Sequence, residues 1–159
     1  MNSEAYCQAF TKCFGIQAIT LRFFNVYGPK NENSPYSGVI TKFISKANNN
    51  QPLTVEGDGE QTRDFIHVND VAQALFLALK AENVGGEVFN ICTGKPTSIN
   101  NLVNTLKIAT GKNLQVTAGP PRISDIRFSY GDATKAKEKL RFKAKTTLQE
   151  GITHLIANA

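Results

Sequence analysis

The sequence has 159 residues, of which 41% are hydrophobic and 19% are charged. This length fits one domain with a hydrophobic core, and the composition excludes a disordered tail. The net charge of +5 describes either a mildly basic solvated surface or an attraction to anions such as a diphosphate. Because the basic residues are spread along the chain, we do not expect nucleic-acid binding.

The residues that could bind a metal ion are few and scattered: Cys7, Cys13, Cys92, His67 and His154. Their spacing predicts no metal site and favours free thiols in a reducing compartment. The first four residues do not resemble a signal peptide, and the most apolar stretch, residues 71–79, is too short to span a bilayer. We therefore expect a cytoplasmic protein that makes no contact with a membrane.

The first predicted elements are a helix, a strand and a turn. Aromatic and small residues at helical spacing predict a helix over 4–14, which Gly15 ends. An apolar run over 16–24, rich in branched and aromatic residues, predicts a buried strand. Residues 25–29, Asn-Val-Tyr-Gly-Pro, are typical of a turn, and a polar loop follows at 30–35.

The middle of the chain alternates between helices and short strands. An apolar stripe predicts a helix over 39–47. Two short strands are predicted over 53–55 and 62–68, on either side of a tight Gly-Asp-Gly turn at 57–59. Asp70 stands where the N-cap of the next helix belongs, with Gln73 three residues later and the apolar Val71, Leu75 and Leu79 behind it.

The last third continues this alternation. Residues 88–91 predict a buried strand, and Ser98 and Gly111 bound the helix that follows. Residues 114–116 are a further strand candidate. Two final helices are indicated by Asp132 and by the capping-box pattern Thr-Leu-Gln-Glu at 147–150. This order of elements predicts an α/β or α+β fold.

Two phosphate-binding motifs are excluded. Residues 94–97, Gly-Lys-Pro-Thr, resemble the end of a P-loop, but Phe89 occupies the position of its first glycine and Pro96 that of its hydroxyl residue. The glycine-rich dinucleotide fingerprint occurs nowhere in the chain.

Three groups of polar residues leave alternatives open. Arg63 and Asp64 form either an exposed ion pair on an edge strand or a site in which the arginine faces a phosphate. Arg122 and Asp125 form either a surface salt bridge or a nucleotide-binding pair. Asn25 either satisfies a turn or donates its amide to an oxyanion.

Cys92 and His67 read as packing residues, although a nucleophilic cysteine–histidine pair stays open.

Taken in order, these fragments resemble the extended short-chain dehydrogenase/reductases, in particular the UDP-glucose 4-epimerase and nucleotide-sugar dehydratase branch. The resemblance covers essentially the whole chain. Its segments are Glu-Ala-Tyr-Cys at 4–7, Leu-Arg-Phe-Phe-Asn-Val-Tyr-Gly-Pro at 21–29, Tyr-Ser-Gly-Val-Ile at 36–40, Gly-Asp-Gly-Glu-Gln-Thr-Arg-Asp-Phe-Ile-His-Val-Asn-Asp-Val at 57–71, Phe-Asn-Ile at 89–91 and Asp-Ala-Thr-Lys-Ala at 132–136.

The resemblance implies a nucleotide-sugar site and assigns roles to its residues. Contacts to the diphosphate would come from Asn25, Arg63 and Arg122. The nucleotide pocket would be lined by Val55 and Phe65, and Asp125 would hold the ribose. The family usually has glycine where this chain has Ser124. If that position needs a positive φ, serine costs about 1 kcal/mol or shifts the loop.

The same resemblance implies that the NAD-binding half of the fold lies outside this sequence. Family members begin with a glycine-rich NAD-binding unit and carry a catalytic Tyr-x-x-x-Lys pair, whose lysine would fall just before Met1. Tyr6 is no substitute, because Phe10 stands four positions after it. We therefore expect residues 1–159 to form the nucleotide-sugar-binding domain, with the last part of the Rossmann-like sheet in about the first 30 residues. We expect no catalytic, cofactor-binding or metal-binding residue in this chain.

Three functions follow from this resemblance. The chain is the UDP-sugar-binding portion of an epimerase and inactive alone, or a subunit of a split epimerase or dehydratase completed by a separate NAD-binding chain, or a non-catalytic module that binds a UDP- or dTDP-sugar. NAD is the cofactor of the family, but we expect this chain alone to bind none. A cut first helix and an exposed strand edge predict self-association into a homo-oligomer, or pairing with the NAD-binding chain.

Overall fold

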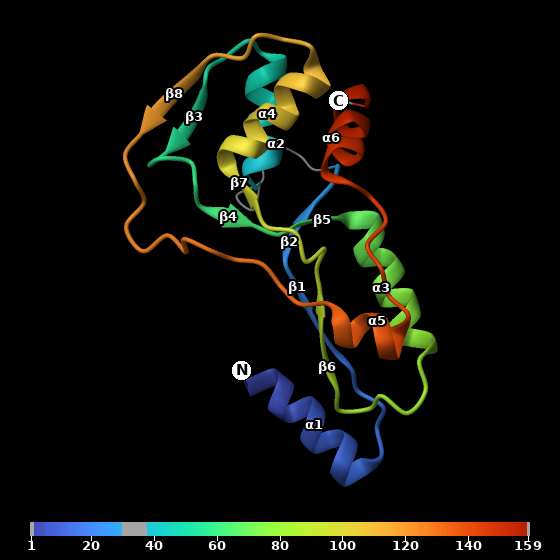
Figure 1. Ribbon diagram of the computed structural model, residues 1–159. Coiled ribbons are helices and arrows are strands. Elements are labelled where there is room, and N and C mark those ends of the chain that lie inside the picture. Colours follow the sequence, from blue (N-terminus) through green and yellow to red (C-terminus); the bar gives the residue numbers. More distant parts are fainter. Residues whose placement is uncertain (1, 30–37, 159) are drawn as a thin grey trace.

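The computed structural model describes residues 2–29 and 38–158 (Figure 1). The predicted loop at 30–35 and the first two residues of the motif at 36–40 lie outside the described residues. The helices are α1 (Asn2–Phe14), α2 (Val39–Asn48), α3 (Val68–Lys80), α4 (Ile99–Thr110), α5 (Thr134–Leu140) and α6 (Leu148–Ala157). The strands are β1 (Thr20–Phe23), β2 (Asn25–Tyr27), β3 (Leu53–Glu56), β4 (Thr62–Arg63), β5 (Phe65–His67), β6 (Val88–Ile91), β7 (Thr97–Ser98) and β8 (Val116–Gly119).

Strands pair at long range, and most of the pairs are parallel. The parallel pairs are β1 with β6, β2 with β5 and β3 with β8, whereas β4 and β7 are antiparallel. Parallel strands need long connections, and the chain between the paired strands β1 and β6 includes α2 and α3. The predicted α/β class is therefore confirmed.

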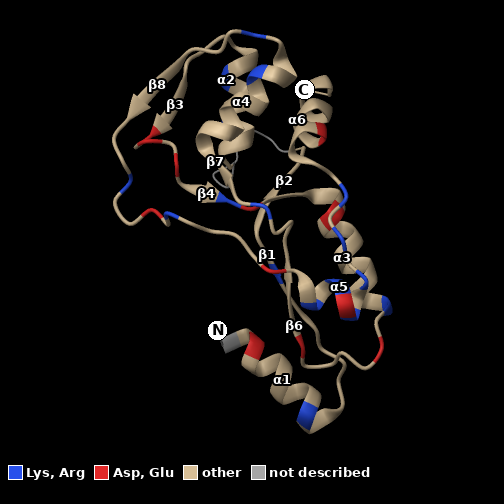
Figure 2. Ribbon diagram, viewed as in Figure 1, with Lys and Arg blue, Asp and Glu red and all other residues tan. Residues whose placement is uncertain are grey.

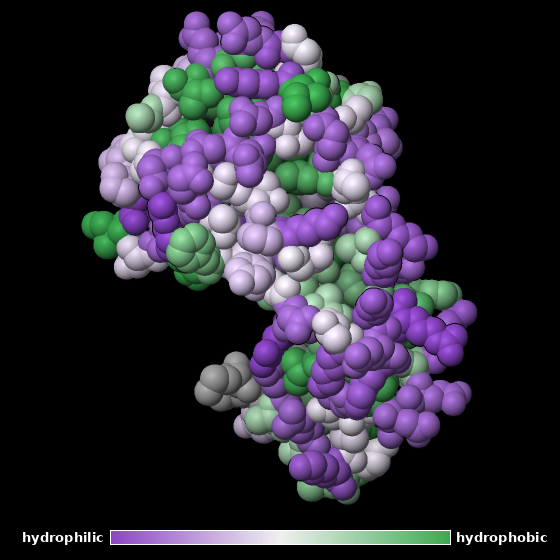
Figure 3. Space-filling model, viewed as in Figure 1, coloured by the Kyte–Doolittle hydropathy of each residue, from purple (hydrophilic) through white to green (hydrophobic). Residues whose placement is uncertain are grey.

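The buried hydrophobic residues form two clusters, one in each part of the molecule, and strands contribute to both (Figure 1). One contains the apolar faces of α2, α4 and α6 with Leu53 and Val55 of β3. The other contains the apolar faces of α3 and α5 with Phe89 and Ile91 of β6. The space-filling view shows the indentation between these two parts of the molecule (Figure 3).

The first predicted strand and the turn after it differ from the structure. Residues 16–19 are not in a strand, and β1 covers only Thr20–Phe23. Residues 25–27, predicted as a turn, form β2 and pair with β5. This pairing joins residues far apart in the sequence, so the local Asn-Val-Tyr-Gly-Pro pattern could not reveal it.

The prediction that Asp70 caps a helix is wrong. Helix α3 begins two residues earlier, and the Nδ1 of His67 accepts a hydrogen bond from the Asn69 backbone N–H at 3.2 Å. Asp70 is buried and accepts from the backbone N–H groups of Lys145 and Thr146, at 3.0 and 3.1 Å. It thereby ties α3 to the segment before α6.

Leu75 and Leu79 of α3, expected on its apolar side, are exposed in the structure. Val71, the third apolar residue predicted there, is buried, and Asp70, Ala74 and Ala78 complete the buried side of this helix.

The other helix boundaries follow local signals. Ser98 caps α4, Gly111 ends it with φ 65°, and Thr147 and Glu150 form a complete capping box. Asp132 accepts from the backbone N–H of Thr134 at 2.8 Å where α5 begins. The strand expected at 114–116 is displaced, because β8 runs from Val116 to Gly119 alongside β3.

Burial of His67 makes stability depend on pH. The His67 Nε2 is buried without a hydrogen-bond partner among the described residues, and desolvation lowers the pKa of His67 despite the opposing charge of Asp70. A histidine whose folded-state pKa is depressed stabilises the fold above its unfolded pKa of about 6.5 and loses that contribution as pH falls. We expect the free energy of unfolding to decline as pH drops below about 6.5.

Urea unfolding of the wild type and of His67→Asn at several pH values tests this expectation. Asparagine can still cap α3 but does not titrate, so the pH dependence should shrink in the variant. An unchanged slope in His67→Asn would assign the pH dependence to other groups.

Candidate functional site

Most of the residues expected to bind a nucleotide sugar surround one cavity. Its volume is about 380 Å³, and α2, β3 and the chain after β8 contribute to its lining. Five of the six predicted residues line it: Asn25, Arg63, Phe65, Arg122 and Asp125. The sixth, Val55, is buried in the hydrophobic core. Successive side chains of a strand point to opposite faces, so Thr54 and Glu56, on either side of Val55, line the cavity instead.

Two lysine side chains that were not predicted from the sequence also line the cavity. Lys42 and Lys46 of α2 line it, and the Lys46 Nζ donates to the Thr54 Oγ1 at 3.2 Å. Their separation by one helical turn on the polar side of α2 is the sequence signal that could have found them. With Arg63 and Arg122 the cavity holds four cations, against two carboxylates, so its formal charge is four minus two, or +2.

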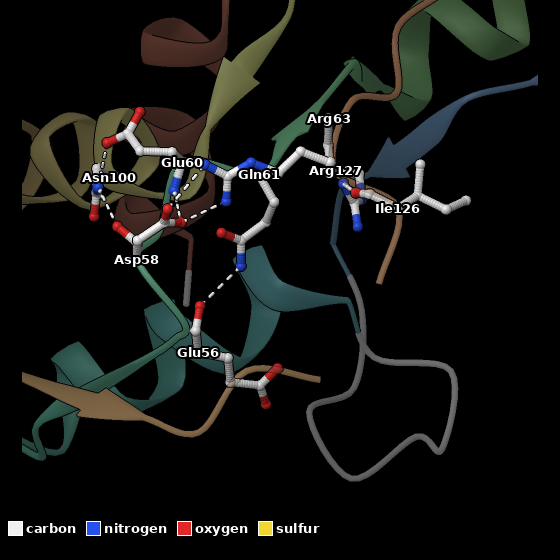
Figure 4. A network of polar contacts seen from close by, with 8 residues as sticks. All are labelled: Glu56, Asp58, Glu60, Gln61, Arg63, Asn100, Ile126 and Arg127. Carbon is white, nitrogen blue, oxygen red and sulfur yellow. Dashed lines mark hydrogen bonds and ion pairs between the residues drawn. The ribbon is translucent and has the colours of Figure 1, made fainter. Parts of the chain in front are cut away.

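Arg63 is held rigidly by the loop after β8. Its Nη1 donates to the backbone carbonyls of Thr62 and Ile126, at 2.7 and 2.6 Å, and its Nη2 donates to the Asp125 Oδ1 at 2.5 Å. Its side chain is only 17% exposed. Figure 4 shows its place beside Ile126. The anticipated ion pair between Arg63 and Asp64 is not formed.

Asp64 instead points into the protein and joins two loops. It is fully buried and accepts from the Thr93 N–H and hydroxyl at 2.8 and 2.7 Å, and from the Gly94 N–H at 2.8 Å. The Gly131 N–H donates to the same carboxylate at 3.4 Å. This arrangement separates β4 from β5 and turns Arg63 toward the cavity.

Arg122 pairs with Glu56 rather than with Asp125. Its Nη2 donates to the Glu56 Oε1 at 2.9 Å, and this hydrogen bond raises the pKa of Arg122. The Arg122 side chain is 66% exposed, in contrast to the enclosed Arg63. The Arg122–Asp125 salt bridge considered from the sequence is therefore not formed. Asp125 pairs with Arg63, and Arg122 pairs with Glu56.

The Gly-Asp-Gly turn after β3, next to the cavity-lining Glu56, is held by a network of polar contacts (Figure 4). Arg127 donates to both carboxylate oxygens of Asp58, at 2.6 and 2.8 Å, and these bonds lower the pKa of Asp58 to about 2. Asn100 donates to the Asp58 carbonyl and to Glu60. Charges of both signs therefore follow this turn and the chain after β8 (Figure 2).

Ser124 adopts a left-handed backbone conformation, with φ 65°. Side chains with a Cβ are strained there by about 1 kcal/mol, so Ser124→Gly should stabilise the loop that carries Arg122 and Asp125 by up to about that amount. Thermal unfolding measures the change. Ser129→Gly is the control, because Ser129 is not among the residues with positive φ and its replacement should not stabilise. Equal effects of the two substitutions would contradict this assignment.

Cys92 and His67 are packing residues, as expected. Burial, followed by the charge of Asp64, raises the pKa of the Cys92 thiol to about 11, so the thiol stays protonated at neutral pH. His67 uses its Nδ1 as a helix cap. Neither side chain lines the cavity.

A larger cavity, of about 750 Å³, lies elsewhere and is lined by lysines of three segments, among them Lys95, Lys137 and Lys145. Of the predicted residues it contains only Phe65, so we place the candidate site in the smaller cavity. Among residues 2–29 and 38–158, no group of three or more His, Cys, Asp or Glu side chains could hold a metal ion. No helix in that part of the chain is long and apolar enough to cross a membrane.

Two strand-to-helix connections of the described chain do not have the glycine-rich turn of the NAD site that the resemblance implies. In the described chain, β5 leads directly into α3 and β7 into α4, with His67 and Ser98 as caps, so neither connection contains a glycine-rich turn for a pyrophosphate. We therefore assign no chemical step through NAD to this chain.

Several known nucleotide-sugar 4-epimerases are similar to this chain in sequence and in structure. A putative UDP-glucose 4-epimerase of Methanocaldococcus jannaschii is 39% identical over 153 residues, covering 96% of this chain and 49% of the relative. The structure of Thermotoga maritima UDP-glucose 4-epimerase with UDP-glucose matches with a TM-score of 0.91 and 37% identity, covering 98% of this chain and 50% of that one. The UDP-N-acetylglucosamine 4-epimerase of Methanobrevibacter ruminantium, in complex with UDP-N-acetylmuramic acid, matches with a TM-score of 0.91 and 34% identity at the same coverage.

The chain spans about half the length of the curated relatives it matches. The model of the NAD dependent epimerase/dehydratase family matches residues 1–92, which include the strands β1, β2, β5 and β6 and the cavity-lining Arg63. The chain therefore belongs to the NAD dependent epimerase/dehydratase family.

Proposed function

We propose that the cavity around Arg63 binds the nucleotide diphosphate of a UDP- or dTDP-sugar. The observation that carries this proposal is the formal charge of +2 of the described residues that line the cavity, together with an arginine, Arg63, that is already held in place. A diphosphate ester carries two negative charges, and arginine presents donors in a fork that suits phosphate oxygens. Two of the similar solved structures were determined with UDP-linked sugars.

Each residue has a role in this proposal. Asn25, Arg63 and Arg122 contact the diphosphate, and Asp125 accepts from a ribose hydroxyl. Phe65 forms the apolar wall of the nucleotide pocket, while Val55 supports that wall from the core. Residues 1–159 form the nucleotide-sugar-binding domain, with about the first 30 residues belonging to the Rossmann-like sheet.

The chain acts, in this proposal, as the UDP-sugar-binding portion of a cytoplasmic UDP-glucose 4-epimerase-like protein and is inactive alone. Epimerisation in the family depends on NAD, and hydride transfer is the chemistry that this cofactor supplies when bound. This chain's residues bind and orient the nucleotide, and other residues carry the reaction.

Calorimetric titration of the purified chain with UDP, UDP-glucose, uridine and NAD tests the proposal. We expect UDP and UDP-glucose to bind with similar affinity, because the contacts described are to the nucleotide, and uridine to bind much more weakly. NAD should not bind. Equal affinity for UDP and uridine would exclude a diphosphate site, and binding of none of the four would contradict the proposal altogether.

A second candidate is a subunit of a split enzyme, and the exposed face of α1 favours it. Helix α1 lies apart from both hydrophobic clusters (Figure 1), and its side chains Tyr6 and Phe14 are 66% and 69% exposed. Such an aromatic face is a surface for a second protein. A separate NAD-binding chain or a second copy of this chain would cover it, and light scattering with and without the NAD-binding half of a relative distinguishes the two. A lone chain that stays monomeric and binds no such half would argue for a non-catalytic binding module.

A further inference from the structure

The two arginines of the cavity are held in different ways. Arg63 has three oxygen acceptors from the chain around it, so its guanidinium is fixed before any ligand arrives. Among the described residues, Arg122 pairs with the carboxylate of Glu56 alone, through its Nη2 and its Nε, and most of its side chain is in solvent. A long exposed side chain with one partner can exchange that partner at little cost, because exposed ion pairs contribute about 1 kcal/mol or less.

Glu56 has far less freedom than Arg122. It is the last residue of β3, paired with β8, and its carbonyl accepts from the Gln61 Nε2 at 3.0 Å. The turn that follows is fixed by Asp58, Arg127 and Asn100 (Figure 4). The Glu56 carboxylate therefore stays at the cavity, and it is Arg122 that can move.

We infer that Glu56 competes with the ligand's phosphate for Arg122, so that binding of a nucleotide diphosphate includes an exchange of Arg122 from Glu56 to phosphate. This inference rests on the proposed function and adds a residue that sets affinity and selectivity for charge. A diphosphate carries more charge than the single carboxylate and can displace it, whereas a neutral nucleoside cannot. Glu56 lines the cavity in which the diphosphate is proposed to bind, so its negative charge also repels that ligand directly.

Substitution of Glu56 by glutamine tests this inference by calorimetry with UDP and uridine. Glutamine keeps the size of the side chain but neither competes as an anion nor repels phosphate. We expect Glu56→Gln to bind UDP about threefold to fivefold more tightly, the range that an exposed ion pair supplies. Its affinity for uridine should not change.

A double-mutant cycle separates competition for Arg122 from general electrostatics. Arg122→Ala should weaken UDP binding, and adding Glu56→Gln to it should restore much less than the gain seen in the wild-type background. Glu60→Gln is the matched control: it removes the same charge from the same turn, but Glu60 does not line the cavity. It should leave UDP affinity unchanged.

The outcomes distinguish this inference from the proposed function. Wild-type binding of UDP together with unchanged affinity in Glu56→Gln would overturn the inference alone. Equal gains in Glu56→Gln and Glu60→Gln would overturn it as well, because they would show a general effect of charge. A wild-type chain that does not bind UDP would overturn both.

Discussion

Replacing Asp64 by alanine should lower the free energy of unfolding by at least about 3 kcal/mol, because three backbone N–H groups and the Thr93 hydroxyl lose a charged acceptor inside the protein. Asp64 is fully buried and receives hydrogen bonds from Thr93, Gly94 and Gly131. Each buried donor left without a partner costs about 1–3 kcal/mol. Urea unfolding followed by circular dichroism measures the loss.

Asparagine at position 64 should give an intermediate loss, since it keeps one acceptor oxygen but turns an amide N–H toward a donor. Asp58→Asn is the control. Asp58 pairs with Arg127 at the surface, where solvent screens the interaction, so this substitution should lower the free energy of unfolding much less than Asp64→Ala. If Asp64→Ala and Asp58→Asn were equally stable, the buried carboxylate would not hold the loops together.

Arg63→Ala should weaken UDP binding by roughly tenfold to a hundredfold, in the range of about 1.5–3 kcal/mol that hydrogen bonds to charged groups contribute. The substitution removes a cation from the cavity and releases the loop held through Asp125 and Ile126. Calorimetry with UDP measures the change. Arg63→Lys keeps the charge but cannot reach three acceptors in a fixed plane, so it should restore only part of the affinity.

Arg127→Ala controls for the loss of positive charge near the cavity. Arg127 lies in the same loop, two residues after Asp125, but pairs with Asp58 and does not line the cavity. Its loss should change UDP affinity far less than the loss of Arg63. Equal weakening by the two substitutions would reduce Arg63 to a general electrostatic contribution.

Local signals in the sequence predicted much of the fold. Ser98 and Thr147 accept hydrogen bonds from backbone groups within three residues, so their capping role can be read from the sequence. Asp70 has the same signature, but its partners at 145 and 146 lie far along the chain. Nothing near Asp70 indicates those partners, and the predicted cap was wrong for that reason.

In the candidate site, too, the sequence indicated most of the residues but not the contacts that depend on distant parts of the chain. The ordered motifs indicated Asn25, Arg63, Phe65, Arg122 and Asp125, which the fold brings to one cavity. The partners of the two arginines could not be predicted, because each depends on how the loop after β8 lies against β3 and β4. The lysines of α2 were missed because a basic side chain on a polar helix face usually faces solvent.

The pairing of the strands has a consequence for synthesis of the chain on the ribosome. Thr20 pairs with Val88 and Leu53 with Val116, so β1 and β3 emerge from the ribosome long before their partners β6 and β8. Contacts between residues so far apart form slowly, because a long loop must close before the contact stabilises anything. During translation β2 can therefore pair with β5 as soon as residues 65–67 are available and β1 with β6 once residues 88–91 are, whereas β8, the partner of β3, is the last strand to be made.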